Sequence, residues 1–164
     1  LMLRFFKKNK VVEILSPVTG KIVPIEEVLD ETFAKKRSGD GLGVELTDGK
    51  IIAPFDGEIT SVYNANHCLV VSSEESGLEL LIHIGIDTIK LKGEGFKRNV
   101  ELNDKVKAGD VLLEADLELI KSKGKSIITP VIITNRRYVE SIEKMNGQVE
   151  KGKDLLMKVI LKKE

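Results

Sequence analysis

The chain has 164 residues, of which 41% are hydrophobic and 32% are charged, a composition typical of a folded globular protein that excludes an intrinsically disordered one. Its 26 Lys and Arg residues balance its 26 Asp and Glu residues, and the zero net charge gives no general attraction to nucleic acid or to an anionic membrane. Cys68 is the only cysteine, so no internal disulfide can form and we expect a reducing compartment, the cytoplasm.

The predicted elements are mainly short strands between turns that contain glycine, proline or aspartate. In chain order, runs typical of strands lie at residues 21–25, 50–55, 58–63, 68–72, 78–84, 111–115, 126–134 and 155–161. Stretches that favour short helices lie at residues 30–37, 117–123 and 137–145, and we interpret residues 39–43 as a turn. Short strands at this spacing predict an all-β fold, an antiparallel β-sandwich or barrel with a few short helices.

Two internal similarities bear on this architecture. Residues 16–22 resemble residues 53–59, and residues 106–113 resemble residues 149–156. A duplicated β unit and the repeated use of the same turn chemistry account for them equally well, so the sequence leaves both interpretations open.

We expect one domain, because no low-complexity linker interrupts the chain. Residues 14–164 are assigned to this domain and residues 1–13 to a flexible N-terminal tail. The tail begins with apolar and basic residues, which allow at most a weak contact with a membrane surface. No apolar run reaches the roughly 18 residues that a membrane-spanning helix needs.

The only two histidines of the chain, His67 and His83, stand at the two ends of a predicted hairpin. A hairpin centred on residue 75 places them directly opposite each other, with Cβ atoms about 4.5–5.5 Å apart. Cys68 is then expected to face the core as a small hydrophobic residue. Along the second strand, alternation puts His83 on the face opposite the core-facing residues Leu80, Ile82 and Ile84.

Two adjacent imidazoles are consistent with three interpretations. A phosphohistidine carrier is one, because imidazole has a pKa of about 6.5 and is nucleophilic near neutral pH, and a second ring can donate to phosphoryl oxygens. A metal site is another, although it needs a further ligand from Asp, Glu or a partner. Two structural histidines are the third, and the spacing alone leaves all three open.

Residues 80–96 closely resemble the phosphorylation-site signature of the glucose-type enzyme IIA domains of the bacterial phosphoenolpyruvate:sugar phosphotransferase system. The resemblance runs from about Ile14 to the end of the chain, with further matches at residues 16–20, 53–57 and 106–110. It implies an antiparallel β-sandwich and a phosphocarrier that accepts phosphate from the phosphocarrier protein HPr. The phosphate would pass to an enzyme IIB domain of a sugar permease, with no cofactor required and no nucleic acid as partner.

The resemblance also implies roles for individual residues. His83 corresponds to the phosphorylated residue, with Nε2 as nucleophile and Nδ1–H held by the carbonyl of Gly85. His67 corresponds to an assisting histidine that donates to the phosphoryl group. Asp87 and Asp30 match acidic positions that would help docking to HPr. The apolar rim of the family's site maps to Phe33, Tyr63 and Leu81.

Some positions depart from the family pattern. Ala65 stands where a threonine usually precedes the first histidine by two residues, which removes a hydroxyl expected to orient His67. Thr32 and Ser38 make the docking surface more polar than usual. An alternative function is a regulatory module that binds target proteins without phosphotransfer, in which His67, His83 and a carboxylate of the partner hold zinc at the interface.

Overall fold

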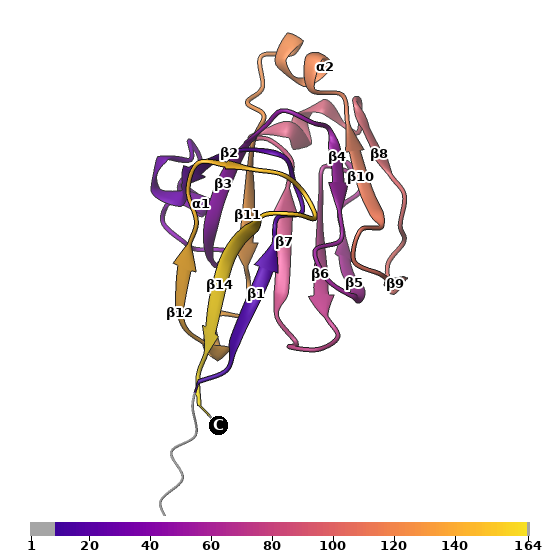
Figure 1. Ribbon diagram of the computed structural model, residues 1–164. Helices are drawn as coiled ribbons and strands as arrows, with labels where there is room; N and C mark the ends of the chain where they lie inside the picture. Colours follow the sequence, from indigo (N-terminus) through magenta and orange to yellow (C-terminus); the bar gives the residue numbers. More distant parts are fainter. Residues whose placement is uncertain (1–8, 164) are drawn as a thin grey trace, which may run out of the picture.

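The computed structural model describes residues 9–163, which are built almost entirely from antiparallel strands (Figure 1). The strands are β1 (Val11–Leu15), β2 (Gly20–Pro24), β3 (Asp40–Leu46), β4 (Lys50–Ile52), β5 (Gly57–Val62), β6 (Cys68–Ser73), β7 (Glu79–His83), β8 (Phe96–Arg98), β9 (Lys105–Val106), β10 (Val111–Ala115), β11 (Ile128–Ile133), β12 (Val139–Lys144), β13 (Gln148–Val149) and β14 (Leu155–Leu161). The helices are α1 (Glu31–Ala34) and α2 (Leu117–Ser122), with short 3-10 turns at Ile25–Glu27, Thr88–Leu91 and Arg136–Tyr138. Within residues 9–163 the longest helix, α2, has 6 residues, so no helix there is long enough to cross a membrane.

The strands form one large sheet and two small ones. The large sheet has the order β13-β2-β3-β11-β7-β6-β5-β9, and the small sheets have the orders β1-β14-β12 and β4-β10-β8. In Figure 1 the small sheet with β14 lies in front of the large sheet, and the one with β10 lies beside it. One apolar core includes residues from all three sheets, among them Ile14, Val44, Ile82, Leu113 and Val159. The β-sandwich predicted from the sequence is confirmed.

A second, smaller apolar cluster covers the opposite face of the large sheet. Its members are Ile25, Val28, Phe33, Cys68, Val70, Leu81 and Ile132. Along β7, Leu80 and Ile82 belong to the main core and Leu81 to the second cluster, as strand alternation requires. Cys68 is buried as predicted, but in this second cluster rather than in the main core.

The helix predicted at residues 137–145 is wrong. A 3-10 turn is followed there by β12, which pairs with β14. Val139 and Ile142 are three residues apart, a spacing typical of a helix face, yet both pack against the core. The register of the β12–β14 pair shifts between Val139 and Ser141, and this bulge inserts the extra residue that gives the helix-like spacing.

The structure differs from the sequence-based assignment of the tail and of one turn. Strand β1 begins at Val11, so it takes in the last three residues that we assigned to the tail, and residues 1–8 lie outside the described part. The turn expected at residues 39–43 is largely the start of β3. A Cβ atom at Gly41 would collide with the carbonyl oxygen of Val131 on β11, so glycine here permits close strand pairing instead of a turn.

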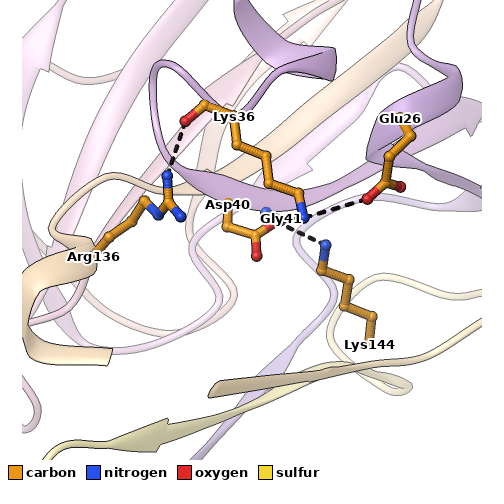
Figure 2. Close-up of polar contacts among 6 residues, drawn as sticks. All are labelled: Glu26, Lys36, Asp40, Gly41, Arg136 and Lys144. Atoms are coloured by element: carbon orange, nitrogen blue, oxygen red, sulfur yellow. Dashed lines mark hydrogen bonds and ion pairs between the residues drawn. The ribbon is translucent and has the colours of Figure 1, made fainter. Parts of the chain in front are cut away.

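A charged cluster fastens the segment around α1 to the sheets (Figure 2). Asp40, at the start of β3, accepts a hydrogen bond of 2.7 Å from Lys144 of β12. Lys36, just after α1, lies 3.3 Å from Glu26, and its carbonyl accepts from Arg136 at 3.0 Å. Because these partners come from distant parts of the chain, the cluster holds the segment that covers the second apolar cluster in place.

Candidate functional site

His83 is the last residue of β7, and its ring has one nitrogen fixed by the backbone. Its Nδ1 lies 2.8 Å from the carbonyl oxygen of Gly85. A carbonyl oxygen only accepts, so the neutral ring carries its proton on Nδ1 and leaves the lone pair of Nε2 free. The contact that the resemblance led us to expect between His83 and Gly85 is present.

The backbone after His83 is held in a conformation that requires glycine. Gly85 has a φ of +73°, and a Cβ atom there would lie 2.5 Å from the carbonyl oxygen of Ser126. Its amide donates to Thr129 Oγ1 at 3.2 Å, and the hydroxyl of Thr88 donates to the Ile84 carbonyl at 2.6 Å. These contacts fix the peptide between Ile84 and Gly85 and so place Gly85, whose carbonyl holds His83. They give Thr88 and Thr129 a part in the site that the sequence analysis missed.

The two histidine rings meet, although the predicted register is wrong. Cys68, and not His67, lies opposite His83 in the β6–β7 pair. The ring centroids of His67 and His83 are nevertheless 4.8 Å apart, with an angle of 86° between the ring planes. His67 precedes β6 and follows Asn66, whose φ is +59°, so the alternation within the strand does not set the direction of its side chain.

His67 is buried between aromatic side chains at the edge of a surface hollow. Its side chain is 2% exposed, and its ring lies 6.0 Å from that of Tyr63 and 6.4 Å from that of Phe96. Its Nδ1 is buried and has no hydrogen-bond partner among residues 9–163, which agrees with alanine rather than threonine at position 65. The hollow has a volume of about 500 Å³ and is lined by Tyr63, Asn64, Ala65, His67, Ile89 and Lys92.

Burial keeps both rings neutral near neutral pH. Desolvation, with a smaller contribution from the charge of His83, lowers the pKa of His67 to about 4. Desolvation also lowers the pKa of His83, and the hydrogen bond to Gly85 and the carboxylate of Asp30 partly oppose this shift. A neutral imidazole retains the lone pair that a nucleophile needs, so the environment favours nucleophilic chemistry at His83.

The expected rim residues gather around the histidines, but two of them are buried. The Phe33 ring lies 5.2 Å from that of His83, edge to face, and Leu81 belongs to the same apolar cluster. Phe33 therefore packs against the His83 ring from within this cluster, whereas Tyr63 is 41% exposed. Asp30 caps α1 by accepting a hydrogen bond from the amide of Thr32 at 2.9 Å, which places its carboxylate at the N-terminus of this helix.

Asp87 has partners that the sequence analysis did not anticipate. Its Oδ2 lies 2.9 Å from the ammonium group of Lys90 and 3.0 Å from that of Lys125. Hydrogen bonds from Lys90 and then Lys125 lower the pKa of this carboxyl group below its usual value. Lys90 is close to Asp87 in sequence, whereas Lys125 is 38 residues away. Only the contact with Lys90 could therefore be inferred from neighbouring residues in the sequence.

A complete metal site is not assembled by the described residues. Among residues 9–163, no group of three or more His, Cys, Asp and Glu side chains is placed to hold a metal ion. His67 and His83 would supply two ligands, and any zinc ion bound there would take its further ligands from outside this group.

Comparisons with known proteins show which proteins this chain is similar to. The family model described as phosphoenolpyruvate-dependent sugar phosphotransferase system, EIIA 1, matches residues 12–139. The glucose-specific EIIA component of Buchnera aphidicola is 42% identical over 152 residues, which cover 93% of this chain and 94% of that protein. A glucose-specific EIICBA component of Staphylococcus saprophyticus is 46% identical over 154 residues, 91% of this chain and 22% of that longer protein.

A solved structure extends the similarity to the fold. The glucose permease IIA of Mycoplasma capricolum superposes with a TM-score of 0.82 at 32% sequence identity, covering 95% of this chain and 99% of that one. The match of the family model over most of the chain and the identities above 40% confirm the resemblance seen in the sequence. The chain belongs to the EIIA 1 family of the phosphoenolpyruvate-dependent sugar phosphotransferase system.

Proposed function

We propose that this protein is a cytoplasmic phosphocarrier that accepts a phosphoryl group from HPr on His83 and passes it to the IIB domain of a sugar permease. The observation that carries this proposal is the hydrogen bond of 2.8 Å between His83 Nδ1 and the Gly85 carbonyl, which leaves Nε2 unprotonated beside the ring of His67. The relative that unites the A, B and C components in one chain supports a IIB domain as the acceptor.

Acceptance of the phosphoryl group starts from the neutral His83 ring. The Nε2 lone pair forms a bond to phosphorus, the bond from phosphorus to the donor breaks, and its electron pair returns to the donor. The ring becomes more positive as the new bond forms, and the Gly85 carbonyl stabilises the Nδ1–H that carries part of this charge. In transfer to the acceptor, a nucleophile of the IIB domain forms a bond to phosphorus, the bond from phosphorus to His83 Nε2 breaks, and its electron pair returns to the imidazole ring. Neither step calls for a cofactor.

His67 assists by donating a hydrogen bond to the phosphoryl group. Its lowered pKa, about 4, keeps it neutral, and a neutral ring has one N–H group. Because Nδ1 of His67 is buried, Nε2 is the nitrogen that can reach a phosphoryl oxygen on His83. This donation stabilises the negative charge on the phosphoryl oxygens during transfer.

Docking of HPr rests on the surface around the two histidines. Tyr63 and Ile89 expose apolar area beside the hollow at His67. Asp30 and Asp87 offer carboxylates for basic residues of HPr, which speeds association more than it strengthens binding.

The experiment that tests this function follows label from phosphoenolpyruvate onto the protein, with enzyme I and HPr supplied. We expect an acid-labile, base-stable label that disappears in His83→Gln. His67→Gln should still accept phosphate but should pass it to a IIB domain slowly. Label retained in His83→Gln would show that the phosphorylated residue is a different one, and label in neither protein would leave zinc-dependent protein binding as the function to examine.

A further inference from the structure

The loop that presents His67 depends on one residue with an unusual backbone conformation. This loop joins β5 to β6, and within it Asn66 has a φ of +59° and donates its amide to the Tyr63 carbonyl at 2.8 Å. Asparagine tolerates this left-handed region better than most residues do. The direction in which the chain enters His67 is therefore set at Asn66.

Arg98, at the end of β8, holds the side chain of Asn66. Its Nε donates to Asn66 Oδ1 at 3.0 Å. One terminal nitrogen of the same guanidinium donates to the Val100 carbonyl at 3.1 Å and to Glu101 Oε2 at 3.2 Å. The Arg98 side chain is only 19% exposed, so these contacts are made in a partly desolvated place where a hydrogen bond to a charged group is strong.

His67 has little else to fix its orientation. Its Nδ1 has no hydrogen-bond partner within residues 9–163, and Ala65 supplies no hydroxyl. The remaining restraints are ring packing against His83, Tyr63 and Phe96 and the backbone on either side. Phe96 belongs to the same strand as Arg98, so β8 restrains both the ring of His67 and the residue before it.

We propose that Arg98 is a positioning residue that acts through Asn66 to hold His67 in its orientation toward His83. This inference rests on the proposed function, because the role of His67 is to donate to a phosphoryl group on His83. The planar guanidinium binds Asn66 and the backbone of its own segment at the same time through different nitrogens. A lysine ammonium has three N–H donors, but they all leave one nitrogen and lack the fixed spacing between Nε and the terminal nitrogens that these two contacts use.

The first test compares Arg98→Met with Lys97→Met. Lys97 is the neighbouring residue on β8, its side chain is 73% exposed, and it pairs with Glu114, so its removal deletes the same charge from the same strand. In Arg98→Met we expect label on His83 to reach the wild-type level and onward transfer to IIB to slow by about tenfold to a hundredfold. Lys97→Met should behave as wild type, and equal slowing in both variants would overturn the proposal.

A second variant guards against misfolding of Arg98→Met. Asn66→Gly keeps the left-handed backbone accessible and removes the side chain that Arg98 binds. It should slow onward transfer to a similar degree, whereas a wild-type rate in Asn66→Gly would contradict the route through Asn66. Arg98→Lys keeps the positive charge but removes the planar guanidinium, and it should restore little of the rate of onward transfer. This result would show that the hydrogen bonds of the guanidinium matter and not the charge alone.

A double-mutant cycle shows whether Arg98 acts through His67. Once His67→Gln has slowed onward transfer, adding Arg98→Met should slow it no further, because both substitutions impair the same step through the same residue, His67. Persistent slowing by Arg98→Met in this background would mean that Arg98 serves partner docking by its charge, which contradicts the proposal.

A readout that needs no phosphate separates this proposal from the proposed function. In the unphosphorylated protein, ring signals of His67 and the nuclear Overhauser contacts between His67 and His83 report the ring orientation. Arg98→Met should shift or weaken them and Lys97→Met should not. If the wild-type protein took no label, the proposed function would fail, but these spectra would still decide the role of Arg98. Unchanged His67 signals in Arg98→Met would overturn the positioning role of Arg98.

Discussion

Cys68 of β6 lies directly opposite His83 of β7, so the thiol and the imidazole share the face of the large sheet that the α1 segment covers. Directly opposed side chains in an antiparallel pair are in contact distance. The thiol therefore forms part of the apolar wall beside the candidate nucleophile. Burial raises the pKa of Cys68 to about 12, so this wall stays uncharged at any pH at which the protein functions.

Cys68→Ser should lower stability without stopping phosphorylation. The serine hydroxyl would be buried in an apolar cluster, and an unpaired buried hydroxyl costs about 1–3 kcal/mol. Urea unfolding should show this loss, while label on His83 should reach the wild-type level because the thiol takes no part in the transfer. The neutral, buried thiol should also resist alkylation in the folded protein. Loss of label at unchanged stability would instead assign Cys68 a chemical role.

Thr129→Val should destabilise the site by removing the hydrogen bond that holds the Gly85 amide. Valine has nearly the same shape but cannot accept the 3.2 Å hydrogen bond from the Gly85 amide, and the amide is left buried without that partner. We expect a loss of about 1–3 kcal/mol in the free energy of unfolding. Labelling from phospho-HPr should also be slower, because the carbonyl that holds His83 becomes free to move.

Thr134→Val is the matched control for that variant. Thr134 lies in the chain just after the same strand, β11, and its hydroxyl donates to Glu79 at 3.0 Å, away from Gly85. Labelling rates should stay at the wild-type value in Thr134→Val. If both variants slow labelling alike, the effect comes from β11 as a whole and not from the support of Gly85.

The parts of the fold that depend on local pattern could be predicted from the sequence. The two faces of β7 followed from alternation, and α1 and α2 lie within stretches that the sequence predicts as helical, residues 30–37 and 117–123. The register of β6 and β7 could not be predicted, because it is set by the turn. Gly77, with a φ of +75°, donates its amide to the Ser73 carbonyl, and this turn moves the hairpin centre by half a residue and the pairing by one.

The site depends on contacts that no local pattern reveals. Arg98 reaches Asn66 across 32 residues, and Thr129 reaches Gly85 across 44. In sequence, Arg98 reads as one of many basic residues, and Thr129 as a β-branched residue in a strand. Such residues become recognisable only when the fold brings them beside the backbone that carries the histidines.

Lys90→Ala should strengthen productive encounters with HPr. Lys90 lies 2.9 Å from Asp87, and this contact competes with any basic residue of HPr for the same carboxylate. Removing Lys90 frees part of that carboxylate and removes a repelling charge, so the KM for phospho-HPr should fall by about twofold to fivefold at low salt. The difference should shrink at high salt, because exposed charges are screened. A rise in KM would mean that Lys90 itself contacts the donor.

The buried neutral state of His67 should make stability depend on pH in a defined window. The pKa of His67 is about 4 in the folded protein, below its ordinary value of 6.5. Between these values the unfolded chain binds more protons at this residue than the folded protein, so stability falls as the pH falls from 6.5 towards 4. Below about pH 4 both states are protonated and this contribution stops changing.

His67→Gln should flatten this dependence. Glutamine does not titrate, so urea unfolding of the unphosphorylated variant at a series of pH values should lose the part of the slope that His67 contributes. The difference between the two proteins should reach up to about 3 kcal/mol between pH 6.5 and pH 4, the equivalent of the pKa shift. Carboxyl groups titrate in both proteins and largely cancel in the comparison. Parallel stability curves for the wild type and His67→Gln would show that His67 binds its proton in the folded state as readily as in the unfolded chain, which would contradict the desolvation that keeps it a neutral donor beside His83.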